Sequence, residues 1–135
     1  MAGPAAVAER AEELTLDGSV DEAALVGKAV VRAADRLGLT NHELAAVVGL
    51  SEASVSRLRR GRFRLEPGGK PFELALLLIR LFRAVDSLTG GDEKIARAWL
   101  RNPNTALAAV PIERIATVAG LLDVVAYLDS RRAVF

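Results

Sequence analysis

Two closely spaced helix-start signals, separated by a glycine, constrain the fold most strongly, and both lie within residues 40–64. Thr40 and Glu43 have the spacing of a capping box, in which each side chain accepts a hydrogen bond from a free backbone N–H. Gly49 can adopt the left-handed backbone conformation that a tight turn requires. Ser51 is a good N-cap residue for a second helix. The pattern predicts two short helices joined by a tight turn.

The residues of this stretch also predict how the two helices pack and what they contact. Ala45 is small and falls where the helices must cross. Apolar residues fall where they must pack: Leu44, Val48, Leu50, Val55 and Leu58. Five arginines then follow within eight residues: Arg57, Arg59, Arg60, Arg62 and Arg64. This pattern is typical of a helix-turn-helix, whose second helix enters the major groove of DNA.

The second helix of such a motif contacts base edges with its first residues, while flanking basic residues bind phosphates. Arg57 or Arg60 would suit a bidentate contact with guanine. Glu52 would either accept a hydrogen bond from cytosine or repel a phosphate. A single arginine here is equally well explained as a solvated surface charge, so the cluster carries the prediction. The predicted DNA-binding residues are Ser51, Glu52, Ala53, Ser56, Arg57, Arg59, Arg60, Arg62 and Arg64.

The distribution of charge supports a local rather than a general anion-binding surface. The net charge is only +1, from 18 basic and 17 acidic residues. Residues 57–64 hold five arginines and no acid, whereas residues 1–20 hold four acids and one arginine. A basic patch on a nearly neutral chain indicates a defined phosphate-contacting surface.

The spacing of apolar residues predicts an all-α fold of about seven helices, with no strand. We expect a tail or short helix over residues 1–18, a helix-turn-helix domain over 19–70 and a second helical domain over 71–135. The Ser19–Glu22 capping-box spacing predicts where the first helix of the helix-turn-helix domain begins. Residues 72–88 are apolar nearly all round, which predicts a central core helix that also forms half of a dimer interface. Gly120 is expected to end a helix that begins at Pro111.

Several function classes are disfavoured by what the sequence lacks. It has no cysteine and a single histidine, His42, which argues against thiolate and histidine metal sites. His42 is expected to be exposed or to face a phosphate. A glycine-rich phosphate loop is absent, so we predict a non-enzyme without a cofactor. There is no signal-peptide pattern, and the longest apolar run covers only residues 74–79, which predicts a cytoplasmic protein.

The C-terminal half resembles a known family. Residues 99–120 read WLRNPNTALAAVPIERIATVAG and are followed by VVAYL at residues 124–128. This stretch resembles the toxin-binding domain of the MbcA/ParS/Xre antitoxin family. The matching positions are Trp99, Leu100, Pro103, Asn104, Leu107, Pro111, Ile112, Thr117, Gly120, Val124 and Leu128. With the helix-turn-helix upstream, the resemblance covers residues 22–135.

The chain departs from the family pattern at three places. Ala108-Ala109 stands where the family often has a pair of glycines. Val118 stands where an acidic residue usually follows the threonine. The family often continues to a glycine, whereas this sequence ends at Phe135.

The resemblance implies an antitoxin that covers the active site of a RES-domain toxin, an enzyme that consumes NAD⁺, and that represses its own operon. The partners are then this toxin and operator DNA, with the chain as a homodimer or in a hetero-oligomer with the toxin. The predicted toxin-binding residues are Trp99, Asn104, Arg131, Arg132, Ala133, Val134 and Phe135. Without the resemblance, Trp99 is most simply a core residue and residues 131–135 a frayed end.

Two alternatives remain open from the sequence. The chain could be a dimeric helix-turn-helix repressor with no toxin partner, whose C-terminal half only dimerises or senses a ligand. An enzyme would need a catalytic site that the sequence does not reveal.

Overall fold

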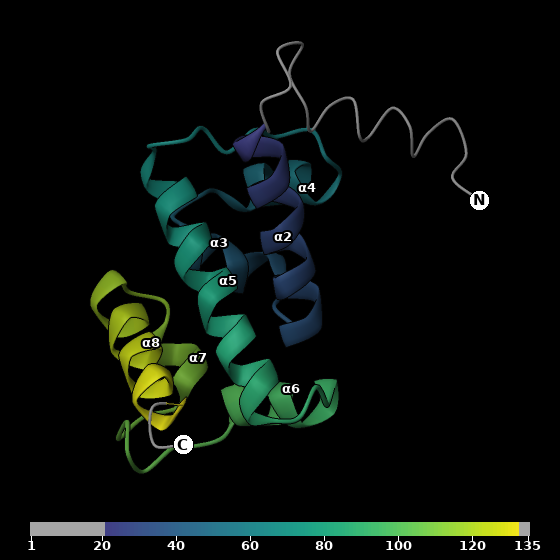
Figure 1. Cartoon of the computed structure of the whole chain (residues 1–135). Helices are drawn as coiled ribbons and strands as arrows, with labels where there is room; N and C mark the ends of the chain where they lie inside the picture. The colour runs from purple at the N-terminus through teal and green to yellow at the C-terminus, as the bar shows by residue number, and fades with distance from the viewer. Residues whose placement is uncertain (1–20, 133–135) are drawn as a thin grey trace, which may run out of the picture.

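Residues 21–132 are described by the structure, a computed structural model, and they form seven α-helices (Figure 1). The helices are α2 (Glu22–Leu37), α3 (Asn41–Val48), α4 (Glu52–Arg59), α5 (Lys70–Leu88), α6 (Glu93–Arg101), α7 (Pro111–Arg114) and α8 (Val118–Arg132). Over this range there is no strand, and the predicted all-α fold is confirmed. None of these seven helices is long and apolar enough to cross a membrane.

The N-cap of α2 lies two residues after Ser19, so the prediction from the Ser19–Glu22 capping box is wrong. Its N-cap is Asp21, whose Oδ1 accepts a hydrogen bond from Ala24 N at 3.3 Å. Aspartate caps a helix as well as serine does, and Asp21 directly precedes the first helical residue. Ser19 itself lies outside the described residues. At the other end, Gly38 adopts φ 70° and closes the helix.

Helix α5 is the central element of the core. It packs against α2 and α3 on one side and against α8 on the other (Figure 1). Its buried residues are Phe72, Ala75, Leu78, Leu81, Ala84 and Val85. They belong to one continuous hydrophobic cluster that reaches from Leu44 of α3 to Leu128 of α8. The predicted central role of this helix is confirmed, and the domain boundary predicted at residue 70 stays a prediction because the core runs across it.

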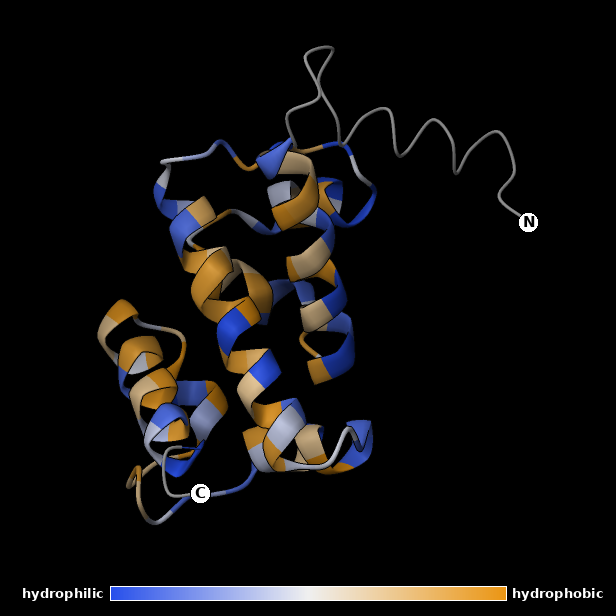
Figure 2. Cartoon of the chain, in the orientation of Figure 1, coloured by the Kyte–Doolittle hydropathy of each residue, from blue (hydrophilic) through white to orange (hydrophobic). Residues whose placement is uncertain are grey.

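Burial of α5 is nevertheless incomplete. Figure 2 shows a largely hydrophobic helix interrupted by a few hydrophilic residues. Leu76 and Leu88 remain 45% and 38% exposed, although both are apolar. The helix begins at Lys70, so Pro71 occupies the second rather than the first helical position. A dimer contact through α5 stays a prediction.

The region around Gly120 differs from the expectation. Helix α7 is only one turn long, and α8 begins at Val118, so Gly120 lies inside α8 and does not end a helix. A Cβ atom at Gly120 would lie 1.8 Å from the carbonyl oxygen of Arg114. The glycine is therefore needed for close approach between the α7 end and the first turn of α8. Thr117 Oγ1 accepts a hydrogen bond from Gly120 N at 3.0 Å and satisfies one free N–H of that turn.

Candidate functional site

Helices α3 and α4 form the predicted helix-turn-helix. Both capping-box bonds are present: Thr40 Oγ1 accepts from Glu43 N at 3.1 Å, and Glu43 Oε1 accepts from Thr40 N at 2.9 Å. Gly49 ends α3 with φ 70°, and Ser51 Oγ accepts from Ser54 N at 3.1 Å to cap α4. Of the five apolar residues that the sequence assigned to the packing surface, Leu44, Val48, Val55 and Leu58 are buried, and Leu50 is partly buried against the core. Local signals therefore fix this motif.

The first residues of α4, the recognition helix, are open to solvent. Ser51, Glu52 and Ala53 are exposed, and Ser56 is half-buried. Glu52 Oε2 lies 3.3 Å from Nδ1 of His42 in the first turn of α3. His42 is exposed, as expected from the sequence. The start of α4 thus offers short polar and apolar groups, with one carboxylate directed toward a histidine.

Three of the five clustered arginines are available for a ligand. Arg57 donates through Nη2 to Ser54 Oγ at 3.0 Å, and its guanidinium carbon lies 5.9 Å from the centre of the Phe63 ring. These contacts orient Arg57 without neutralising its charge. Arg60 and Arg62 are exposed, and within residues 21–132 neither side chain has a hydrogen-bond or ion-pair partner. All three cations lie within or just after α4.

The other two arginines bind groups of the protein itself. Arg59 forms an ion pair with Asp35 in the last turn of α2, and its Nη2 donates to the carbonyl oxygen of Leu39 at 2.8 Å. Its side chain is only 22% exposed. It therefore holds the recognition helix against the end of α2, a role that the sequence did not indicate.

Arg64 anchors the segment that follows α4. Its Nη1 lies 3.0 Å from Asp21 Oδ2, and its Nε lies 3.0 Å from Glu66 Oε1. The hydrogen bond from Arg64 lowers the pKa of the Asp21 carboxyl, which also receives the N–H of Ala24. The same contact with Asp21 raises the pKa of Arg64. Arg64 thereby joins the α4–α5 segment to the start of α2.

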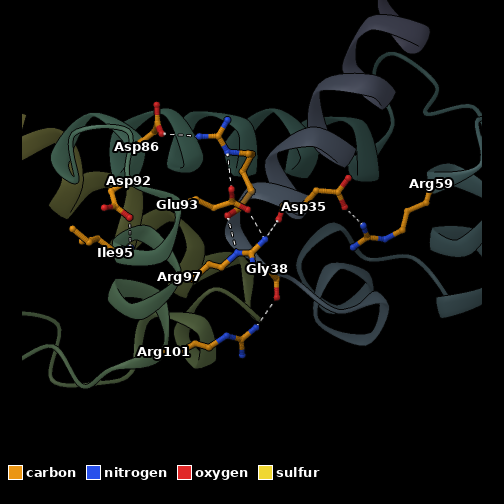
Figure 3. A network of polar contacts seen from close by, with 10 residues as sticks. Asp35, Gly38, Arg59, Asp86, Asp92, Glu93, Ile95, Arg97 and Arg101 are labelled. Atoms are coloured by element: carbon orange, nitrogen blue, oxygen red, sulfur yellow. Dashed lines mark hydrogen bonds and ion pairs between the residues drawn. The ribbon is translucent and has the colours of Figure 1, made fainter.

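Helix α6 is attached to the end of α2 by two arginines (Figure 3). Arg97 Nη2 donates to the carbonyl oxygen of Asp35 at 2.7 Å, and its Nε donates to that of Arg36 at 3.2 Å. Arg101 Nη2 donates to the carbonyl oxygen of Gly38 at 2.8 Å. These carbonyls lie at the C-terminal end of α2, where the helix ladder leaves carbonyls free, and that of Asp35 also accepts from Gly38 N at 3.2 Å. The two arginines therefore cap α2 from the C-terminal half of the chain.

Two of the predicted toxin-binding residues have structural contacts. Trp99 is half-buried and packs against the core, as expected if it is a core residue. Asn104 Oδ1 accepts from Leu107 N at 3.2 Å, and the Asn104 and Ala109 backbones exchange hydrogen bonds of 2.9 and 3.3 Å. Asn104 thus closes the turn between α6 and α7.

The remaining predicted toxin-binding residues belong to the end of the chain. Arg131 and Arg132 are exposed in the last turn of α8, and within the described part of the chain neither has a polar partner. Ala133, Val134 and Phe135 lie outside the described residues. Among the described residues of this set, Trp99 and Asn104 sit in the α6–α7 region, and the two arginines sit at the end of α8.

The turn closed by Asn104 contains an unusual backbone. Ala108 adopts φ 53°, and it is the single non-glycine residue of the described range with a positive φ. This left-handed conformation disfavours residues that carry a Cβ. It coincides with the position where the resembling family often has glycine.

Over residues 21–132, no group of three or more His, Asp or Glu side chains is placed to hold a metal ion. The cationic side chains of Arg57, Arg60 and Arg62 lie within and just after α4.

Comparisons with known proteins assign both halves. The model described as the antitoxin Xre-like helix-turn-helix domain matches residues 18–80. The model described as the antitoxin Xre/MbcA/ParS C-terminal toxin-binding domain matches residues 84–133. No curated protein matches the chain. Because the two matches follow each other and together cover most of its length, the chain belongs to the Xre/MbcA/ParS antitoxin family, with a DNA-binding helix-turn-helix domain and a toxin-binding domain.

Proposed function

We propose that this antitoxin neutralises a RES-domain toxin that consumes NAD⁺ and represses its own operon by binding operator DNA. The observation that carries the proposal is the joining of a complete helix-turn-helix to a matched toxin-binding domain over residues 84–133. The RES class of toxin and its NAD⁺ chemistry rest on the resemblance of residues 99–128 to the family.

For the operator, we assign base contacts to Arg57 and Arg60 and a phosphate contact to Arg62. Arg57 is already oriented by Ser54 and Phe63, which reduces the conformational entropy lost on binding. Arg60 and Arg62 have no partner to give up among the described residues. Arg59 and Arg64 support the recognition helix instead, since phosphate contacts would compete with their present acidic partners. A homodimer would place two such helices in half-sites about one helical turn apart.

For the toxin, we assign the inhibitory contact to the end of the chain. Arg131 and Arg132 are exposed cations at the end of α8, and Ala133, Val134 and Phe135 follow them. A basic segment followed by apolar residues has the chemistry to enter a pocket built for a dinucleotide, which binds phosphates, rings and cationic groups. Occlusion of this kind needs no catalytic residue in the antitoxin.

The test is co-expression with the product of the neighbouring reading frame. The wild-type chain is expected to rescue growth, restore cellular NAD⁺ and co-purify with that product. A chain that ends at Ser130 is expected to retain operator binding but lose the rescue.

A dimeric repressor without a toxin partner gives a different result. Removal of Arg131–Phe135 would then leave every phenotype unchanged, and the neighbouring product would be neither toxic nor bound. That outcome would replace the proposal by the repressor alternative.

A further inference from the structure

Helix α8 has two apolar faces, of which the core uses one. Leu121, Val124, Val125 and Leu128 are buried, and α8 packs chiefly on α5. On the opposite side, Val118 and Leu122 remain 56% and 48% exposed. The core therefore accounts for only half of the apolar side chains on this helix.

The exposed apolar residues form a continuous line. Val118, Leu122 and Ala126 recur every four residues, which places them one above another on a helix. Ala126 is exposed, and so is Ala119 beside the line. We call Val118, Ala119, Leu122 and Ala126 the α8 stripe. It presents two large side chains, Val118 and Leu122, next to the methyl groups of Ala119 and Ala126. A partner's apolar side chains can pack on this uneven surface.

The α8 stripe is held rigidly before any partner arrives. Asp123, on the same side of the helix, forms an ion pair with Arg114 of α7. The close approach of Gly120 to the Arg114 carbonyl and the Thr117 cap fix the first turn of α8. A surface already in its binding geometry loses little conformational entropy on association.

We propose that the α8 stripe is the surface on which the toxin docks, a proposal that rests on the function proposed above. The stripe lies inside the matched toxin-binding domain. It runs along α8 toward Arg131 and Arg132, so a toxin whose active site receives the end of the chain must lie alongside this helix. The stripe then supplies apolar burial, and the exposed Arg131 and Arg132 at the end of α8 supply charge.

The size of the stripe argues against a second copy of this chain as its occupant. Val118 to Ala126 spans about 12 Å at the helical rise per residue. A stable protein–protein interface buries about 800 Å² on each partner. Two large side chains fall well short of that area by themselves. The stripe needs a second contact surface to hold a partner, and the adjoining Arg131 and Arg132, which lie within the same toxin-binding match, supply one for the toxin.

The experiment measures the affinity of the purified full-length chain for the purified product of the neighbouring reading frame. Leu122→Glu places a charge in the middle of the stripe. Leu122→Met is the matched control, because it keeps an apolar side chain of similar size at the same position. We expect Leu122→Glu to weaken toxin binding by about tenfold or more, as at other buried apolar anchors. Leu122→Met should stay within about twofold of wild type.

Each outcome decides between the alternatives. If the wild-type chain binds no toxin, both the proposed function and this inference fail. If it binds and Leu122→Glu binds equally well, the stripe is excluded while the proposed function stands. If Leu122→Glu instead abolishes self-association and leaves toxin affinity unchanged, a second copy occupies the stripe and the inference is overturned.

If the Leu122→Glu variant does not fold, a second experiment tests whether the toxin contacts the stripe. Hydrogen exchange on the wild-type complex reports the same contact without a substitution. Protection of the amides of residues 118–126 on toxin binding, beyond that of residues 41–48 in α3, supports the stripe. Equal protection of both segments overturns it.

Discussion

Arg101 in α6 forms a bidentate ion pair with Glu43 in the first turn of α3, with nitrogen–oxygen distances of 2.8 and 2.9 Å. Glu43 also completes the capping box with Thr40. One carboxylate therefore closes the first helix of the DNA-binding motif and receives an arginine from the toxin-binding domain. Ion pairs of this geometry are stronger than those with one hydrogen bond. The pair joins residues 58 positions apart in the sequence.

Stability at acid pH should depend on this pair. Hydrogen bonds from Arg101 hold the pKa of Glu43 at about 2, below its ordinary value of 4.5. The folded state thus binds this proton less readily than the unfolded state. The contribution of Glu43 to the free energy of unfolding is fully present above pH 4.5 and is lost as the pH falls toward about 2. Glu43→Gln should lower that free energy at neutral pH and flatten its decline over this window, as measured by urea unfolding at a series of pH values.

Arg101→Met provides the partner control for the same measurement. It removes the cation and leaves the carboxylate, so it should flatten the same pH window. The double variant should be less destabilised than the sum of the two single variants, by about 1 kcal/mol for a partly exposed pair. Strict additivity would show that the two side chains act independently.

The sequence predicted the parts of the fold that depend on neighbouring residues. Caps and turns act over three or four positions, so Thr40, Gly49 and Ser51 could be read directly. The helix-turn-helix and the all-α class followed from them. Gly120 was misread because a glycine that ends a helix and a glycine that permits close approach look alike in a sequence.

Contacts between distant residues could not be predicted in this way. The arginine cluster read as one DNA-binding set, but Arg59 pairs with an acid 24 positions away. Nothing in the local pattern distinguishes Arg59 from Arg60, since both lie near the end of α4. Only the packing of α4 on α2 directs one side chain inward and the other outward. The α8 stripe was missed for the same reason, because Leu121 and Leu122 are equivalent until α5 covers one of them.

Substitution of the outward arginines should affect operator binding and leave stability unchanged. Arg57→Ala and Arg60→Ala are each expected to weaken binding by roughly 1–3 kcal/mol if they contact guanine. Arg62→Ala should weaken binding to all sequences alike. It should also reduce the slope of log K against log salt concentration by about one, because one phosphate contact is lost. Gel shifts at several salt concentrations measure both effects. Unchanged affinity in the Arg57 and Arg60 variants would remove these residues from the interface.

Substitution of Arg59 should affect stability first. Arg59→Met removes the ion pair with Asp35 and the hydrogen bond to the Leu39 carbonyl, and we expect a loss of about 1–2 kcal/mol in the free energy of unfolding. Asp35→Asn removes the ion pair but keeps the carbonyl contact, so its effect should be smaller. Thermal unfolding followed by circular dichroism compares them. An Arg59→Met variant with wild-type stability and lost DNA binding would instead assign Arg59 to the operator.

Gly120→Ala should be among the most damaging small substitutions in the chain. The added Cβ would lie 1.8 Å from the Arg114 carbonyl oxygen, a contact that side-chain rotation cannot relieve. Helices α7 and α8 must then separate, at a cost of about 1–3 kcal/mol or more. Gly61→Ala is an informative comparison, because Gly61 has open space around its Cβ position and only backbone strain from φ 74°. Chemical unfolding should rank Gly120→Ala as the more destabilised of the two.

Ala108→Gly should stabilise the chain, which is uncommon for a substitution to glycine. Ala108 adopts φ 53°, where a Cβ costs about 1–2 kcal/mol, whereas glycine occupies this region freely. The greater entropy of glycine in the unfolded state offsets part of this gain. We expect a net increase of up to about 1 kcal/mol in the free energy of unfolding. The neighbouring Ala109→Gly lacks the positive φ and should destabilise; equal effects at the two positions would show that the turn does not hold Ala108 in this conformation in solution.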